Sequence, residues 1–440
     1  QHREIYPGAG GARSAQGCLM TAEITTLPSG LRVVTDRMAH LETASISVFV
    51  GAGSRYEKLD EQGLSHLLEH MAFKGTRRRS ARQIAEEIEM AGGDLNAATG
   101  AEHTSYHAHV LAGDIPLAID ILADILTESV FDSTELAREK SVILEEIRAV
   151  EDTPDELVFD MLNAAAFPDQ AIGRPVLGTP EHVLGFGRDA IGSYLDAHYH
   201  PRAIVISAAG AVDHALICGE AARRFAKLPE ANRYAEAPPA SYRGGDSRLK
   251  RSFEQTHIAI GFEGCAYTHE DFYAMQLFTT AAGGGMSSRL FQEVREARGL
   301  AYSVHAFHCG YSDTGLFGFY AATDPKKAAE LIPLALECLG QAALDLSDAE
   351  VRRAKAQMKV SLLAALESPA ARCDQIARQL MVFGRVFTRE EMIAAIDGLD
   401  VARIRAAGAR ALRTPPTLAA VGPAARIMGP DRIAARLSGL

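Results

Sequence analysis

The feature of this sequence that most restricts its fold is an internal duplication. When residues 134–154 (TELAREKSVILEEIRAVEDTP) are shifted by 215 positions, they fall on residues 349–369 (AEVRRAKAQMKVSLLAALESP), with the apolar positions in register. Pro154 and Pro369 close the two segments, and each segment follows an apolar helical stretch of similar type. The alternative explanation is two unrelated helices of common composition. We infer instead that the chain contains two copies of one domain.

Each copy is expected to be an α+β domain in which helices cover an antiparallel sheet. Short β-rich runs such as LRVVTD and SISVFVGAGS are bounded by Gly and Pro, as is typical of strands. TSYHAHVL and RAIVISAAGAV are expected to be further strands. Strands and helices that do not strictly alternate favour an α+β fold. Helical periodicity is found in residues 61–74, 80–92, 114–128 and 133–151.

A polar segment rich in Pro and Gly separates the two copies. The stretch PEANRYAEAPPASYRGGDSR has the composition of an interdomain linker, which we place at residues 229–250. The N-terminal domain is then residues 20–228 and the C-terminal domain residues 251–440, joined like the two shells of a clam. Residues 1–19 lack an initiator Met and the apolar core of a signal peptide, so we expect a cloning remnant or a disordered extension.

Composition excludes two classes of function. The 45 Lys and Arg residues are outnumbered by 56 Asp and Glu, and no long Lys/Arg cluster occurs. Nucleic-acid binding is disfavoured because its affinity depends on clustered positive charge. No uninterrupted apolar stretch approaches the roughly 18 residues needed to span a bilayer. We therefore expect a protein that binds neither nucleic acid nor membrane, and we expect it in the cytoplasm because nothing in the sequence directs secretion.

The segment from Gly63 to Gly75 contains a metal-binding pattern. On a helix, His66 and His70 lie four residues apart on one face, and Glu69 lies beside them. This is H-x-x-E-H, the zincin pattern in inverted order. Two imidazoles and one carboxylate are the usual ligands of catalytic Zn²⁺, and a further carboxylate can act as general base. The alternative is a pair of histidines at the margin of a core helix.

The third ligand is expected from the helix at 133–151. Glu139 and Glu146 are two helical turns apart and share a face, whereas Glu145 points about a hundred degrees away. One of the pair could bind the metal while the other orients a histidine. A solvated helix face would explain them equally well if the histidines were absent. The second copy has Ala354 and Ser361 at these positions, which indicates chemistry in the first copy only.

These motifs together resemble the pitrilysin family of zinc metallopeptidases. Within it, the sequence is most similar to the processing-peptidase branch, namely the catalytic β subunit of mitochondrial processing peptidase and its bacterial homologues. The resemblance implies one Zn²⁺ per chain, held by His66, His70 and Glu146, with Glu69 as the catalytic base. It also implies that Glu139 supports a ligand, since Glu139 precedes Glu146 by seven residues.

The resemblance further implies residues that bind substrate. Members of the family add substrate as an extra strand along an Asn-Ala segment, which corresponds here to Asn96, Ala97 and Ala98. An ordinary hairpin edge would fit the same local sequence. In the second half, Arg295 and Tyr302 match an Arg and a Tyr, seven apart, that hold the substrate backbone and stabilise the oxyanion.

Arg298 is a competing choice for this arginine, although its spacing to Tyr302 is four. Arg295 could also lie on a solvated helix face.

In the processing-peptidase branch, two acidic residues recognise a basic residue upstream of the cleaved bond. Glu156 and Asp160 match them, and their i, i+4 spacing would let one guanidinium reach both. The alternative is a charged helix face.

The predicted function is a zinc endopeptidase that cleaves peptides or extended segments inside a chamber. The resemblance implies pairing of chains, and a homodimer would suffice because one chain carries both the zinc motif and the Arg/Tyr pair. A heterodimer with a related subunit is the second option. The competing class is a structural or assembly subunit like the respiratory-complex core proteins, which share the fold and have mostly lost the zinc motif.

Overall fold

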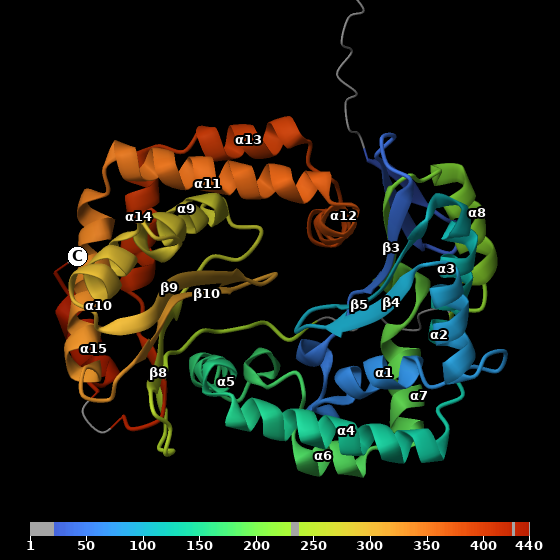
Figure 1. Cartoon of the computed structure of the whole chain (residues 1–440), viewed down its shortest axis with the longest axis horizontal. Helices are drawn as coiled ribbons and strands as arrows, with labels where there is room; N and C mark the ends of the chain where they lie inside the picture. The colour runs from blue at the N-terminus through green and yellow to red at the C-terminus, as the bar shows by residue number, and fades with distance from the viewer. Residues whose placement is uncertain (1–21, 230–236, 425–426, 440) are drawn as a thin grey trace, which may run out of the picture.

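The duplication of the sequence is also present in the folded chain (Figure 1). The structure is a computed structural model, and it describes residues 22–229, 237–424 and 427–439. The extension expected at residues 1–19 lies outside the described residues, as does part of the expected linker. No helix within the described ranges is long and apolar enough to cross a membrane.

A six-stranded sheet forms the first half, in the order β1-β2-β6-β3-β5-β4. Its central strands are rich in Val, Ile and Ala and are buried. The strands are β1 (Glu23–Thr26), β2 (Arg32–Arg37), β3 (Thr43–Val50), β4 (Asp94–Thr99), β5 (Thr104–Leu111) and β6 (Ile204–Gly210). The helices are α1 (Leu64–Ala72), α2 (Ala81–Met90), α3 (Ile115–Thr127), α4 (Ser133–Asp152), α5 (Pro154–Ala166), α6 (Pro180–Gly185), α7 (Arg188–His198) and α8 (His214–Arg224).

A five-stranded sheet forms the second half, in the order β7-β11-β8-β10-β9. Its strands are β7 (Gly245–Leu249), β8 (Thr256–Glu263), β9 (Ala301–Gly310), β10 (Gly315–Thr323) and β11 (Thr417–Val421). The helices are α9 (Phe272–Gly283), α10 (Ala328–Asp345), α11 (Asp348–Glu367), α12 (Pro369–Phe383), α13 (Arg389–Asp397), α14 (Val401–Leu412) and α15 (Pro430–Leu437).

The predicted α+β fold and its duplication are confirmed. Helix α11 begins and ends 215 residues after α4, and α5 and α12 begin at the matched Pro154 and Pro369. The strand order of the second sheet repeats the order β2-β6-β3-β5-β4 of the first. The helices expected at 61–74, 80–92, 114–128 and 133–151 correspond to α1, α2, α3 and α4.

Two details of the prediction were wrong. The sheets are mixed rather than antiparallel, because β2 pairs with β6, and β7 with β11, in parallel. A strand that returns from the far end of a domain can enter the sheet in either direction, whereas a hairpin must be antiparallel. The linker expected at 229–250 also extends too far, because Gly245–Leu249 forms β7.

The two halves exchange a helix. Val158 and Leu162 of α5 are buried against the second sheet, together with Ala259 and Ala419. In the same way, apolar residues of α12 (Ile376, Ala377 and Leu380) pack under the first sheet against Val34, Phe49 and Val205. This exchange explains why β3 is buried on both faces, since its own helices cover only one of them.

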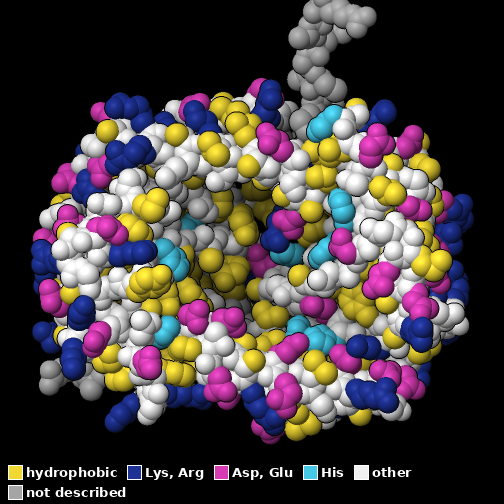
Figure 2. Space-filling view, in the orientation of Figure 1, with side chains coloured by type: hydrophobic (Ala, Val, Ile, Leu, Met, Phe, Trp, Pro, Cys, Tyr) yellow, Lys and Arg dark blue, Asp and Glu magenta, His cyan; other side chains and the backbone are white. Residues whose placement is uncertain are grey.

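The halves face one another across a central hollow (Figure 2). Strands β4 and β9 are the edge strands of their sheets, and both run toward the centre of the molecule in Figure 1. Helix α1 packs against both β4 and α4. The exposed edge of the first sheet therefore lies next to the helix that carries the inverted motif.

Candidate metal centre and substrate surface

The helix that carries the motif is anchored at its N-terminus by Glu57. Its carboxylate accepts hydrogen bonds from Gly63 N at 2.9 Å and from Ser65 N at 2.8 Å. Burial raises the pKa of Glu57 to about 7, although these hydrogen bonds oppose the shift. Gly63 has a φ of 88°, and a Cβ there would lie 2.6 Å from the carbonyl oxygen of Leu177. Only glycine fits this turn into α1.

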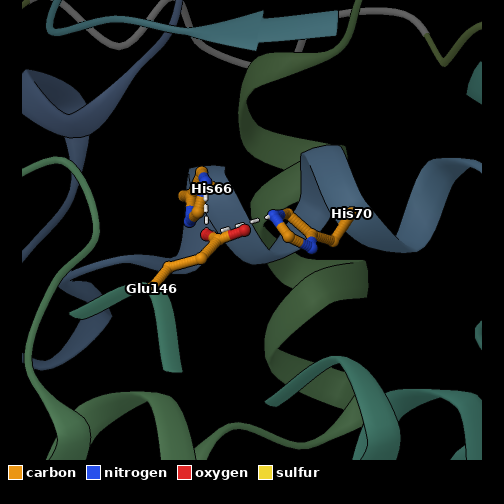
Figure 3. A group of neighbouring side chains, drawn as sticks. All are labelled: His66, His70 and Glu146. Carbon is orange, nitrogen blue, oxygen red and sulfur yellow. Dashed lines mark ion pairs between the residues drawn. The ribbon is translucent and has the colours of Figure 1, made fainter. Parts of the chain in front are cut away.

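His66, His70 and Glu146 converge (Figure 3). The distance from His66 Nε2 to Glu146 Oε2 is 3.7 Å, and from His70 Nε2 to the same oxygen it is 3.6 Å. One potential ligand atom from each residue lies within 4.8 Å of the other two. The histidines come from successive turns of α1 and the carboxylate comes from α4. Residues 76 positions apart in the sequence thus meet at one point.

Glu139 orients one of the two imidazoles. Its Oε2 lies 3.0 Å from His70 Nδ1, and its Oε1 accepts a hydrogen bond from Lys74 Nζ at 2.7 Å. Burial acts to raise the pKa of Glu139, but the bonds from Lys74 and His70 outweigh it and hold the pKa below its usual value. An ionised Glu139 places the proton of His70 on Nδ1, which leaves the lone pair of Nε2 directed toward Glu146.

The group fits a metal ion such as Zn²⁺, which prefers imidazole nitrogen and carboxylate oxygen. Burial and the neighbouring His70 lower the pKa of His66 to about 4, so His66 is neutral and able to coordinate. Glu145 points elsewhere, since its carboxylate accepts from Arg148 Nη1 at 2.5 Å and is 71% exposed. The structure thus distinguishes the three glutamates of α4 as the helical geometry predicted.

Glu69 lies between the two histidines along α1. Its Oε2 is buried and has no hydrogen-bond partner among the described residues. A buried carboxylate oxygen without a partner is costly, and such groups usually mark a site where a ligand or water belongs. Glu69 therefore remains available for chemistry beside the three converging side chains.

The segment Asn96–Ala98 lies on the edge strand of the first sheet. β4 pairs with β5 on one side only, with Asn96 opposite His107 and Ala98 opposite Ser105. Asn96 and Ala98 are exposed, whereas Ala97 faces the core. An open edge next to α1 can accept another strand by backbone hydrogen bonding.

Arg295 and Tyr302 are in contact. Arg295 lies on a short π-helix (Phe291–Ala297), and its guanidinium carbon is 5.0 Å from the centroid of the Tyr302 ring and 4.7 Å from that of Phe291. Tyr302 is 77% exposed near the start of edge strand β9. Arg298 follows the π-helix as its C-terminal cap. The seven-residue spacing thus selects the arginine that stacks on Tyr302.

Glu156 and Asp160 lie one turn apart on α5. Neither forms an ion pair with a described Lys or Arg. Burial and the nearby charge of Glu156 raise the pKa of Asp160. An acidic pair without a cation of its own can receive a guanidinium from a ligand.

Sequence reasoning missed Glu57, Lys74 and Arg55. Lys74 follows His70 by four residues, so it was available as a partner for a helix-derived carboxylate. The contacts of Glu57 and Arg55 depend on the conformations of loops, and periodic patterns in the sequence do not predict loop conformations.

A duplicated α+β fold with a His/His/Glu cluster in one copy defines the class of two-domain zinc proteases. The chain belongs to peptidase family M16. The profile described as insulinase (peptidase family M16) matches residues 32–180, and the profile described as peptidase M16 inactive domain matches residues 185–358. The second match, described as inactive, includes Ala354, one of the two positions at which the second copy lacks a glutamate of the first.

Curated relatives extend over most of the chain. An uncharacterized zinc protease of Rickettsia felis is 38% identical over 401 residues, which cover 91% of this chain and 97% of the relative. An uncharacterized zinc protease of Streptomyces coelicolor is 39% identical and covers 92% of this chain and 90% of the relative. A probable mitochondrial-processing peptidase subunit beta of Arabidopsis thaliana is 37% identical and covers 87% of this chain and 74% of the relative.

Solved structures share the fold. A chain of complex III2 from Candida albicans, bound to Inz-5, superposes with a TM-score of 0.84 at 24% identity and covers 94% of this chain and 99% of that chain. The peptidase M16 inactive domain from Pseudomonas fluorescens gives a TM-score of 0.86 at 19% identity, covering 92% and 99%.

Proposed function

We propose that this protein is a zinc-dependent endopeptidase that hydrolyses extended polypeptide segments. The observation that carries the proposal is the convergence of His66, His70 and Glu146. Relatives named as zinc proteases support the choice of metal. One Zn²⁺ per chain would be held by these three residues, with Glu139 orienting His70 from behind.

A zinc ion bound there would polarise the scissile carbonyl and lower the pKa of a water molecule. Glu69 then acts as general base and takes the proton of the attacking water. Its buried and unpartnered Oε2 supports this role. After attack, the protonated Glu69 returns the proton to the leaving amine, which completes the exchange.

The substrate would bind as an added strand on Asn96, Ala97 and Ala98. Such binding uses the backbone of the substrate and requires it to be extended, so folded proteins are excluded. Arg295 and Tyr302 would contact the substrate backbone from the second half and donate hydrogen bonds to the developing oxyanion. Their mutual stacking and the exposure of Tyr302 support this assignment.

We also infer a preference for Arg near the cleaved bond. The support is the acidic pair Glu156 and Asp160, which has no cation among the described residues. Two peptides that differ only in an upstream Arg or Gln test the preference. Faster cleavage of the Arg peptide, lost in Glu156→Gln, is the expected result, and equal rates would remove the idea.

The competing function is a structural subunit, as suggested by the similar complex III chain, but likeness at 24% identity reports the fold alone. The complete His/His/Glu set favours an enzyme. The relative named as a peptidase subunit is consistent with paired chains. A homodimer, a heterodimer with a related subunit, and a cytoplasmic location stay predictions.

The proposed function is tested by metal content and peptide hydrolysis. The purified protein should contain one zinc per chain and cleave a quenched peptide, with activity lost to a chelator and restored by zinc. Glu146→Gln should lose both zinc and activity. Glu145→Gln is the matched control, because it changes the adjacent, exposed carboxylate on the same helix. A protein that binds no zinc and cleaves nothing would overturn the proposal.

A further inference from the structure

A buried arginine joins the two halves at the turns of their edge hairpins. The side chain of Arg55 is 1% exposed. Its Nη1 donates to Glu102 Oε1 at 2.6 Å, and its Nη2 donates to Asp313 Oδ2 at 2.6 Å. Glu102 lies in the turn between β4 and β5, and Asp313 lies in the turn between β9 and β10. One guanidinium therefore bridges the two hairpins that contain the edge strands.

Direct contacts between the hairpin turns strengthen this bridge. Ser312 donates to Glu102 from its backbone N, at 3.0 Å to Oε2, and from its Oγ, at 2.6 Å to Oε1. The Ser312 hydroxyl also accepts a hydrogen bond from Arg55 Nη1 at 3.2 Å. The Glu102 carboxylate is thus held by Arg55 of the first half and by Ser312 of the second half.

The segment that connects the halves is tied to the same group. The carbonyl oxygen of Pro238 accepts from Arg55 Nη2 at 2.8 Å, and Ala240 N donates to Asp313 Oδ2 at 2.9 Å. Three separate stretches of chain therefore meet at the guanidinium of Arg55. Its planar fork of donors suits several acceptors at once, which a lysine could not satisfy in the same way.

On the first half, Arg55 and the β4–β5 turn behave as one piece. Ser54 N donates to the carbonyl oxygen of Gly100 at 3.2 Å, and Arg55 N donates to that of Ala101 at 2.9 Å. The approach is so close that a Cβ on Gly53 would lie 2.2 Å from the Gly100 oxygen. Arg55 therefore moves together with β4, and Asp313 lies in the turn that follows β9. If Asp313 moves away from Arg55, β9 moves away from β4.

We propose that Arg55 is a positioning residue that sets the separation of β4 and β9, and so the width of the part of the central hollow in which an extended substrate would lie. The inference rests on the proposed function, in which the substrate lies along β4 and meets Tyr302 near the start of β9. Glu102 and Asp313 would repel one another without a buried cation between them. Loss of the bridge should let the two edges separate.

The test uses Asp313→Asn, which keeps the shape of the side chain but removes the charge that pairs with Arg55, and so weakens the bridge while the contacts of Ser312 with Glu102 remain. Asp313 is 38% exposed, so the chain tolerates this change better than the loss of Arg55, which would strand two carboxylates. Asp397→Asn is the matched control. Asp397 is 48% exposed and pairs at 2.8 Å with Lys359 inside the second half only.

The first measurement is the distance between the halves. Spin labels are attached at Met90→Cys and Met286→Cys, which are 88% and 75% exposed in the parent, after Cys18, Cys218 and Cys309 are replaced by Ser. Asp313→Asn should broaden the distance distribution and shift it to longer values. Asp397→Asn should reproduce the parental distribution.

The second measurement is cleavage by the zinc-loaded protein of an unstructured peptide long enough to lie along both edge strands. Asp313→Asn should lower kcat/KM by about tenfold, mainly through KM, with zinc content unchanged. A parental distance distribution and a parental KM in Asp313→Asn would overturn the role of Arg55. A parent that cleaves no peptide would instead overturn the proposed function, because the distance measurement needs no substrate.

Discussion

One of the candidate metal ligands, His70, is held in place by two neighbouring side chains. His70 faces Glu146 because Glu139 takes its other nitrogen, and Glu139 is in turn held by Lys74. Glu69 has no such support at its buried oxygen. The orientation of His70 is therefore fixed, while the buried oxygen of the proposed base Glu69 is left without a hydrogen bond.

Glu69→Gln should retain zinc and lose activity. The substitution keeps the shape of the side chain but removes its ability to accept a proton, so kcat should fall by about a hundred- to ten-thousand-fold. Metal analysis tests the retention of zinc, and the rate of cleavage of a quenched peptide tests the loss of activity. Cleavage at the parental rate would show that Glu69 is not the base.

Lys74→Met should weaken zinc binding without removing a ligand. Without the ammonium group, Glu139 loses its cationic partner and holds His70 less firmly. Loss of such a supporting contact lowers metal affinity by about 10- to 100-fold. Competition with a zinc-binding dye measures the change. Lys58→Met, whose side chain is 77% exposed, is the control and should leave the affinity unaltered.

At the scale of elements, the position of α1 depends on Glu57. The pKa of this buried carboxyl is raised in the folded chain to about 7, against an ordinary value of 4.5. A raised acid pKa means that the folded state binds more protons than the unfolded state in this interval. Stability from this group is therefore present at low pH and is lost as pH rises from about 4.5 to about 7.

Glu57→Gln should remove that part of the pH dependence. Between about pH 5 and about pH 8, the parent should lose up to about 3 kcal/mol more unfolding free energy than the variant. Urea denaturation of both proteins across this range measures the difference. Parallel pH profiles for parent and variant would show that Glu57 does not titrate in the folded protein over this range.

Local patterns in the sequence predicted the helices and most of the candidate metal site, because helical spacing alone brings His66, Glu69 and His70 to one side of α1. The register of α4 likewise separated Glu145 from its neighbours. Local patterns could not reveal the parallel pairing of β2 with β6, because the sequence of a strand does not show in which direction it pairs with a strand far away in the chain. The contacts of Arg55 depend on two hairpin turns and the connecting segment, which are distant in the sequence, so local patterns could not predict them.

At the scale of the whole molecule, α12 is fixed to the first sheet by a buried ion pair. Arg372 Nε donates to Asp36 Oδ2 at 2.7 Å, and the two side chains are 3% and 1% exposed. Arg372 lies in the second half and Asp36 at β2 of the first. The pair therefore supports the exchange of helices between the halves.

Arg372→Ala should destabilise the protein by about 3–5 kcal/mol, because it leaves the carboxylate of Asp36 buried without a partner. Arg378→Ala, six residues further along α12, should cost less than about 1 kcal/mol, since its pair with Asp374 is exposed. Chemical denaturation compares the two variants. Equal losses would mean that the buried pair is not what fastens α12.

The exchange of α5 for α12 has a consequence for how this chain can be divided. Each half packs one of its helices against the sheet of the other half, so the halves can dissociate completely only if both helices leave the partner sheet. Proteolytic cleavage of the connecting segment should give two fragments that stay associated. If the two halves are expressed separately, they should be soluble only when they are mixed. Neither half, transplanted alone into another protein, would bring with it everything needed to cover its own sheet.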